Sequence, residues 1–374
     1  MKFRIQSKTL LSRLSAVSKI ISSKNVLSIL DNFLFTLDGE TLVVTGSDQE
    51  NIITSKLKVE NAQGKGCFAV NVKYLLEALK GMSDQMLTFE INDENLEINI
   101  NYLNGNYNFI GVNGDEFPRK EVNENAENTI VIEMPSKEIA KGITKTLFAV
   151  AVNEEMRPIM MGINWDIKPD HVVFVASDTH KLARYINNRI ATGKERSFVM
   201  PSKPASILLN FLPKDDSMIK MIIDETSVMF VAEEFTLSCR FVKGNYPNYN
   251  SVIPTNNPFD LTVDRQCLLN AVKRVSVFAN VGGLVKFELS RDNIQLKSQD
   301  IDFSTSAQES VSCDYKGEDM VIGFNDARII ELLSNINHDN VVVKLSDPTR
   351  AGVFLPEEQE ENEDFLVLLM PMYI

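Results

Sequence analysis

The chain repeats one pattern six times, and this repeat limits its possible folds more than any other feature. Each copy runs from a short apolar strand through a polar or proline-containing turn into an amphipathic helix. Starts one, three and five lie about 130 residues apart, as do starts two, four and six. The spacing predicts three similar domains, each made of two half-repeats. The six copies are FRIQSKTLLSRLSAV from Phe3, CFAVNVKYLLEALKGM from Cys67, VIEMPSKEIAKGITKTL from Val131, SFVMPSKPASILLNFLP from Ser197, LTVDRQCLLNAVKRV from Leu261 and MVIGFNDARIIELLSNI from Met320.

Charge is divided unequally between the predicted helices and the rest of the chain, whose overall net charge is −13. The helices are expected over residues 7–22, 71–82, 136–150, 202–213, 264–279 and 325–337. They contain 13 Lys and Arg against 5 Asp and Glu, a net of +8, and the other segments contain 25 against 46, a net of −21. Glu is as good a helix former as Lys or Arg, so helix propensity alone does not explain this split. We therefore expect a basic helical surface that faces a polyanion, with acidic faces elsewhere that repel it.

Alternating apolar and polar residues follow each predicted helix, with turns such as Asp38-Gly39 that indicate β-hairpins. An amphipathic helix must bury its apolar face, and the predicted sheets offer that surface. The prediction is an α+β fold with sheets outside and helices on one common side, either as an open array or as a closed ring with a positive bore. Boundaries fall near Asn125–Asn128 and Thr255–Pro258, which gives domains at 1–126, 127–254 and 255–374. The acidic run at 357–364 is expected to be a solvated loop.

Composition excludes several classes of protein. No apolar run approaches the roughly 20 residues of a membrane-spanning helix, and the start MKFRIQSKTLL does not resemble a signal peptide. The four cysteines are far apart, with no CxxC pair and no nearby histidine. We expect a cytoplasmic protein without membrane contact, disulfide, metal or other cofactor.

The strongest catalytic-looking cluster is Ser177-Asp178-Thr179-His180. Triad members must converge in space, and neighbours at one strand end point in different directions. Neither a Gly-x-Ser-x-Gly elbow nor a Gly-x-x-x-x-Gly-Lys phosphate loop occurs. Only His171, His180 and His338 could supply imidazole ligands. We therefore predict that the chain is not an enzyme.

Several phrases, in this order, resemble one known family. They are LSILDNFLF near residue 30, TGSDQE at 45–50, VASDTHKLA at 175–183, GNYPNYNSVIP at 244–254 and the final LLMPMYI. The chain is similar over its whole length to the bacterial DNA polymerase III β subunit family, the sliding clamps. The resemblance implies three DNA-clamp domains per chain and a head-to-tail homodimer that closes into a ring, with twelve helices around duplex DNA. It also implies a replicative DNA polymerase, a clamp-loader ATPase and other proteins with clamp-binding motifs as partners. The alternative is a repeat scaffold that recruits protein partners without encircling DNA.

The resemblance also implies a partner-peptide groove in the middle domain. Matching phrases assign it to Arg157, Met160, Ser177, Thr179, His180, Lys181, Leu182, Pro247, Val252, Leu368, Met370, Pro371, Met372, Tyr373 and Ile374. Methionine is adaptable and suits a surface that accepts several peptides. Pro371 limits strand pairing, so we expect the last residues to be free to line the groove.

The remaining site predictions concern DNA and the dimer. The residues expected to face DNA phosphates are Lys8, Arg13, Lys24, Lys73, Lys80, Lys137, Lys141, Lys145, Lys203, Lys273 and Arg274. By resemblance, Tyr107 and Phe109 of one chain should meet Val277 and Phe278 of the other. The chain departs from the commonest family pattern, Thr-Asp-Gly-His-Arg, at the turn from Ser177 to Lys181. It also carries Glu154, Ser202 and Ser251 at loop positions where some members have Arg or Gln.

Overall fold

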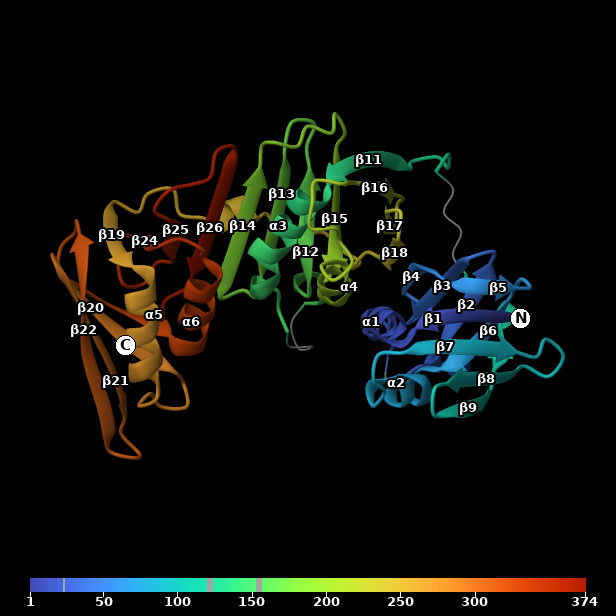
Figure 1. The fold of residues 1–374 in the computed structure, drawn as a ribbon. Coiled ribbons are helices and arrows are strands. Elements are labelled where there is room, and N and C mark those ends of the chain that lie inside the picture. The colour runs from blue at the N-terminus through green and yellow to red at the C-terminus, as the bar shows by residue number, and fades with distance from the viewer. Residues whose placement is uncertain (23, 120–123, 153–156) are drawn as a thin grey trace. The chain divides into compact units, whose positions relative to one another are not determined.

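The structure is a computed structural model that describes residues 1–22, 24–119, 124–152 and 157–374. Six α-helices occur in this part of the chain, one in each repeat (Figure 1). Each helix ends two to five residues before its predicted end, because the apolar periodicity continues into turns such as the 3-10 helix Leu147–Ala149. The helices are α1 Ser7–Val17, α2 Val72–Lys80, α3 Ser136–Thr146, α4 Ser202–Leu208, α5 Arg265–Ser276 and α6 Asp326–Asn335.

The chain divides into two compact units. Unit 1 comprises Met1–Lys137 and Lys203–Phe241, and unit 2 comprises Glu138–Ser202 and Val242–Ile374. Unit 1 has a five-stranded sheet, in the order β5-β1-β7-β8-β9, and a nine-stranded sheet, in the order β10-β6-β2-β3-β4-β18-β17-β16-β11. Its strands are β1 Lys2–Gln6, β2 Asn32–Asp38, β3 Thr41–Ser47, β4 Asn51–Lys58, β5 Glu60–Gln63, β6 Gly66–Asn71, β7 Met86–Ile91, β8 Glu97–Tyr102, β9 Gly105–Ile110, β10 Val112–Asn113, β11 Ile130–Pro135, β16 Met218–Ile223, β17 Ser227–Val231 and β18 Phe235–Arg240.

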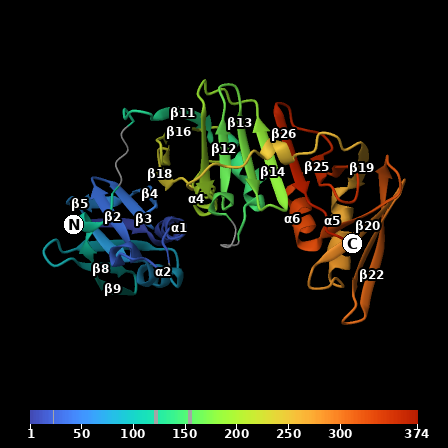
Figure 2. The same cartoon turned by 180° about the vertical axis from the view of Figure 1, so that it is seen from behind.

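Unit 2 is built on one sheet of twelve strands, in the order β15-β12-β13-β14-β26-β25-β24-β19-β22-β21-β20-β23. Figure 2 shows the same elements from behind. The strands are β12 Gly162–Ile167, β13 Val172–Ser177, β14 Lys181–Asn187, β15 Arg196–Pro201, β19 Phe259–Asp264, β20 Leu284–Ser290, β21 Asn293–Asp300, β22 Thr305–Tyr315, β23 Met320–Asn325, β24 Asn340–Leu345, β25 Gly352–Pro356 and β26 Glu363–Leu369.

The two half-repeats of each copy exchange a strand. The strand that leads into the first helix pairs with the second half, as β1·β7, β11·β16 and β19·β24. The strand that leads into the second helix pairs with the first half, as β6·β2, β15·β12 and β23·β20. All three copies therefore share one topology, as the repeat predicts. The domain limits at 126 and 254 stay predictions, since the sheets continue across both positions.

Two strand pairs connect neighbouring copies, and we call them the internal joints. The first is β4·β18, which pairs Ile52 with Ser238, and the second is β14·β26, which pairs Leu182 with Leu368. In each joint, the third strand of one copy's first half pairs with the third strand of the next copy's second half.

Apolar packing and side-chain caps hold the helices against the sheets. Asn71, Asp264 and Asn325 cap α2, α5 and α6 through their side-chain oxygens. A Cβ at Gly142 of α3 would lie 2.5 Å from the ring of Phe174, so only glycine lets this helix approach its sheet so closely. No helix in the described part of the chain is long and apolar enough to cross a membrane.

Candidate functional site

The predicted groove residues Leu182 and Leu368 lie opposite each other in the β14·β26 joint. Both belong to a buried cluster with Val175 and Val353, and partly buried tyrosines pack against that cluster. One of them, Tyr249, lies in the 3-10 helix Tyr249–Val252 and donates a hydrogen bond from its hydroxyl to Asp166 at 3.1 Å. Burial raises the pKa of Tyr249 to about 12.

A second cluster in the same unit contains Met160 together with Ala151, Ile159 and Val199. Tyr246 packs against this cluster and against the first one, and burial raises the pKa of its hydroxyl. Tyr246 therefore contacts both buried clusters. The predicted residues Arg157, Pro247 and Val252 are exposed, and Val252 has 55% of its surface accessible.

Hydrogen bonds between side chains and the backbone hold the turn between β13 and β14. Asp178 Oδ1 accepts from the N–H groups of His180 and Lys181, at 2.9 and 2.8 Å, and Ser177 Oγ donates to the Lys181 carbonyl at 2.8 Å. Thr179 has φ of 73°, a left-handed conformation that is strained for a β-branched residue. The side chains of Ser177 and Asp178 therefore stabilise the turn.

Lys181 is the first residue of β14, directly after this turn. Only 8% of its side chain is exposed, and its Nζ pairs with Glu331 of α6 and with Asp178 at 3.3 Å. Its charge is therefore neutralised within unit 2, whereas His180 is exposed. The sequence placed both residues in the groove without distinguishing these environments.

The chain end is partly paired. The N–H of Met370 donates to the His180 carbonyl at 2.8 Å, and that of Met372 donates to the Gly323 carbonyl of β23 at 2.8 Å. The last residues are therefore less free than Pro371 suggested. A Cβ at Gly323 would lie within 3.2 Å of the Met372 carbonyl and the Ile374 side chain. Tyr373 and Ile374 are 95% and 55% exposed, so the tail presents apolar surface.

Most of the basic residues that were expected to face DNA already have a carboxylate partner in the structure. In unit 1, Arg13 pairs with Glu234, Lys80 with Glu77, Lys137 with Asp216 and Lys203 with Asp48. In unit 2, Arg274 pairs with Glu309. No ion pair with a described carboxylate forms at the exposed residues Lys8, Lys24, Lys73 and Lys273. Glu154 lies outside the described residues, Ser202 begins α4, and Ser251 is exposed.

Lys141 of α3 contacts the acidic run, and Lys145 contacts Phe365, the residue that follows that run. Lys141 Nζ lies 2.5 Å from Glu360 and 2.6 Å from Glu363. Burial opposes the charge of Lys141, but these hydrogen bonds outweigh it and raise the pKa of Lys141. Lys145 lies over the Phe365 ring at 4.6 Å, and burial lowers its pKa. The expectation that residues 357–364 form only a solvated loop is wrong, because Glu363 is buried.

Two of the strands that come third in their half-repeats, β9 and β22, have an open edge. The side of β9 away from β8 has no partner strand among the described residues, and neither do residues 305–312 of β22 on the side away from β21. Tyr107 and Phe109 of β9 are half-buried, and Val277 and Phe278 at the end of α5 are 77% and 39% exposed. We call the unpaired side of β9 the first open edge and the unpaired side of residues 305–312 in β22 the second open edge. Figure 1 labels both strands.

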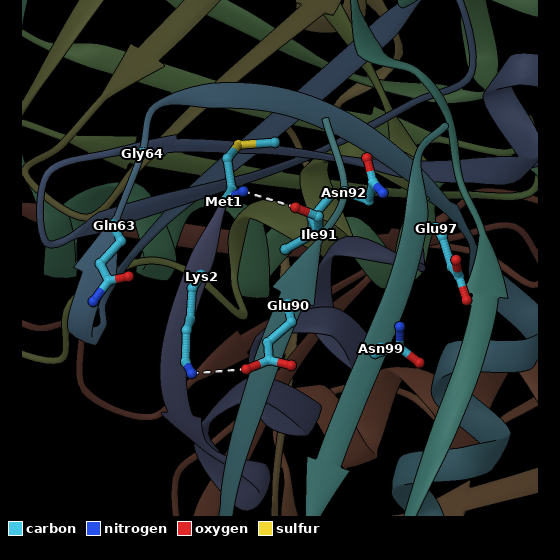
Figure 3. A pocket seen from close by; sticks show the side chains of 9 residues that line it. All are labelled: Met1, Lys2, Gln63, Gly64, Glu90, Ile91, Asn92, Glu97 and Asn99. Carbon is cyan, nitrogen blue, oxygen red and sulfur yellow. Dashed lines mark hydrogen bonds and ion pairs between the residues drawn. The ribbon is translucent and has the colours of Figure 1, made fainter. Parts of the chain in front are cut away.

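A cavity of about 520 Å³ lies on the polar face of the five-stranded sheet, and Figure 3 shows it. Lys2 crosses it to reach Glu90 at 2.7 Å. None of the predicted site residues lines it. Its lining is Met1, Lys2, Gln63, Gly64, Glu90, Ile91, Asn92, Glu97 and Asn99. Within the described ranges, no group of three His, Cys, Asp or Glu side chains could hold a metal ion.

Models of the three domains of the DNA polymerase III beta subunit match the chain in order. The N-terminal model matches residues 1–121, the central model 133–248 and the C-terminal model 250–373. The chain belongs to this family. It has the family's three-domain clamp fold.

Relatives and solved structures cover the whole chain. The beta sliding clamp of Bacillus subtilis is 24% identical over 383 residues, covering 100% of this chain and 99% of the relative. The beta sliding clamp of Pseudomonas aeruginosa is 24% identical, with 100% of both chains covered. The crystal structure of the Pseudomonas aeruginosa clamp bound to griselimycin has a TM-score of 0.91 at 22% identity and covers 100% of both chains. The DNA polymerase III beta subunit of Thermotoga maritima has a TM-score of 0.89 at 24% identity, with 100% of this chain and 99% of that chain covered.

Proposed function

We propose that this chain is a DNA sliding clamp without enzymatic activity that acts in the cytoplasm. Two copies join head to tail into a closed ring around duplex DNA. The ring tethers the replicative polymerase and other replication and repair proteins, and a clamp-loader ATPase places it on DNA. The single observation that carries this proposal is the pairing of strands at the internal joints. Each joint pairs two third strands, and the two third strands that have no such partner in the chain form the open edges.

Each internal joint pairs the third strand of a first half with the third strand of a second half. Among such strands, β4 pairs with β18 and β14 pairs with β26, whereas β22 and β9 remain. An edge strand presents unpaired N–H and C=O groups to another chain. Pairing β9 of one copy with β22 of a second, at both ends, closes a ring of two chains.

The register of the proposed pair is taken by analogy from the internal joints. In each copy, the residue just before the second helix can be followed from strand to strand through the paired residues of the sheet. This path ends at Ile52 in the first copy, at Leu182 in the second and at Ser306 in the third, so these three residues are equivalent. The same count makes Ser238, Leu368 and Asn108 equivalent. Ile52 pairs with Ser238 and Leu182 with Leu368. We therefore expect Ser306 to pair with Asn108 of the second copy.

Side-chain burial supports this pairing. Tyr107 occupies the position of Leu237 in one internal joint and of Val367 in the other, and both of those residues have no exposed surface. Phe109 occupies the position of Cys239 and Leu369, which are also fully buried. Pairing would give Tyr107 and Phe109 the same burial. The exposed Val277 and Phe278 supply apolar partners at the second open edge.

Charge supports DNA as the polyanion in the bore. The six helices contain 12 Lys and Arg against 4 Asp and Glu, a net of +8 in a chain of net −13. A sliding ring needs weak phosphate contacts without base readout. Lys8, Lys24, Lys73 and Lys273 are the best candidates because none is neutralised by a described carboxylate. The residues with partners, such as Arg13 and Lys203, would contribute less.

The apolar surface of unit 2 supports a peptide groove. We propose that a short peptide with a polar anchor and two or three apolar side chains binds between Met160, Leu182, Pro247 and Val252 on one side and residues 370–374 on the other. Met160 and Leu182 are buried at the base of this site, whereas Val252, Tyr373 and Ile374 are exposed, and exposed apolar surface marks a protein-binding site. The groove and the open edges involve different residues, so the ring and its partners can bind together.

Retention on DNA distinguishes the ring from an open scaffold. A ring loaded onto closed circular DNA should stay bound in high salt and leave once the circle is cut. An open scaffold is held by counterion release, so high salt should remove it from both forms of DNA. Equal loss from circular and linear DNA in high salt would contradict the ring.

A further inference from the structure

A cavity of about 390 Å³ lies between α5 and β22, beside the second open edge. Its lining includes Cys267, Asn270 and Arg274 from the helix and Glu309 and Val311 from the strand. Arg274 Nε donates to Glu309 at 3.0 Å, so the lining's guanidinium is already neutralised. The cavity is not part of the peptide groove.

The equivalent place in the β14·β26 joint is filled. By position in their helices and strands, Lys141 corresponds to Asn270, and Asn187 corresponds to Val311. Glu363 occupies this place, directly opposite Asn187 in the ladder. Only 3% of the Glu363 side chain is exposed, and it pairs with Lys141 at 2.6 Å and with Arg189 at 3.4 Å.

The residue equivalent to Glu363 at the first open edge is Leu103. Glu363 precedes Leu368 by as many positions as Leu103 precedes Asn108, and Leu368 and Asn108 are equivalent. Leu103 lies in the turn between β8 and β9 and is 84% exposed. In the proposed register it stands opposite Val311 of a second copy.

The residue that would fill each site matches the residues that line it. The charged Glu363 meets the cation Lys141, whereas the apolar Leu103 would meet the neutral Asn270, Val311 and the Cys267 thiol. Asp264 raises the pKa of Cys267 through a hydrogen bond, which keeps that thiol neutral. We infer that the cavity is a socket for Leu103 of a second copy of this chain. This inference rests on the proposed ring and assigns specificity for self-association to the turn between β8 and β9.

Charge exchange tests the socket. Leu103→Glu should weaken the dimer on the order of a hundredfold, and Leu103→Ala on the order of tenfold, as expected for a buried interface anchor. Adding Asn270→Lys to Leu103→Glu recreates the pair that Glu363 and Lys141 make, and should recover most of the affinity. Dimer dissociation constants come from sedimentation of the full-length protein. Met218→Ala, at a residue that is 52% exposed in β16, is the matched control and should leave the constant unchanged.

A second readout follows the cavity directly. Cys267 is exposed in the single chain, so dimerisation should slow its alkylation, as measured by mass spectrometry on the separated peptides. Two results would overturn the socket and leave the ring in place, provided that the wild-type protein dimerises. One is a dimer dissociation constant that Leu103→Glu leaves unchanged. The other is a weakened Leu103→Glu dimer whose affinity Asn270→Lys does not restore. Wild-type protein that stays monomeric at all concentrations would overturn both.

Discussion

The internal joints and the open edges share one strand geometry but differ in their side chains. The internal joints combine buried apolar residues with ion pairs, such as Arg13 with Glu234 and Lys141 with Glu363. The open edges carry Leu103, Tyr107 and Phe109 on one side and Val277 and Phe278 on the other. An internal joint forms within one chain, so both members of each ion pair are always present. In the proposed ring the open edges associate between chains, so closure would depend on apolar burial and main-chain hydrogen bonds, which salt weakens little.

The largest expected effect comes from one substitution made at two equivalent positions. Val367→Asp leaves an unpaired carboxylate inside an internal joint, and should cost about 3–5 kcal/mol in the free energy of unfolding. Tyr107→Asp places the same carboxylate on an open edge, and should leave a folded monomer. Urea unfolding and sedimentation measure the two outcomes. If Tyr107→Asp lowers the urea midpoint of the single chain as much as Val367→Asp does, β9 is not an open edge.

Deleting residues 370–374 removes part of the groove and leaves the β14·β26 joint intact, because β26 ends at Leu369. The truncated chain should keep its dimer and its fold but bind a polymerase C-terminal peptide at least about tenfold more weakly, since one wall of the groove is removed. Calorimetry with that peptide measures the change. Undiminished affinity would place the partner site elsewhere.

The helix lysines give a smaller effect. Replacing Lys73 and Lys273 by Gln should reduce the slope of log affinity for duplex DNA against log salt, by about 0.9 for each phosphate that the variant no longer neutralises. Lys65→Gln is the control, because Lys65 is exposed, lies outside the helices and pairs with Asp38. Fluorescence anisotropy at several salt concentrations measures the slope. An unchanged slope would remove these two residues from the bore.

The smallest effect concerns the turn beside the second internal joint. Thr179 adopts φ of 73°, and Thr179→Gly should raise the free energy of unfolding by about 1 kcal/mol, because glycine takes this conformation without strain. Thr179→Ala keeps a Cβ in the same position and should change stability less. Thermal unfolding of both variants measures the difference. A decrease in the stability of Thr179→Gly would show that the turn is not strained.

The repeat predicted the fold well because each half-repeat carries its own apolar periodicity and turn residues. It predicted all six helices and the hairpins, and the phrase VASDTHKLA located the turn at residues 177–181. It could not predict the strand exchange or the internal joints, because pairing between distant strands depends on register in three dimensions. For the same reason Lys141 was expected to face DNA, although Glu360 and Glu363 reach it from more than two hundred positions later in the chain. The burial of Lys181 against Glu331 was hidden in the same way.

Cysteine crosslinking between the open edges tests the proposed ring most directly. In the proposed register Asn108 lies opposite Ser306 of a second copy, and directly opposed residues in a ladder lie within disulfide reach. A chain with Asn108→Cys and Ser306→Cys should form a covalent dimer on mild oxidation, and that dimer should close at both ends. Each single variant is a control for the native cysteines at 67, 239, 267 and 313. The proposed ring predicts a dimer crosslinked at this pair in the double variant and at neither position in the single variants. A double variant that stays monomeric, or that crosslinks no more than a pair shifted along β22 such as Asn108→Cys with Ser310→Cys, would contradict it.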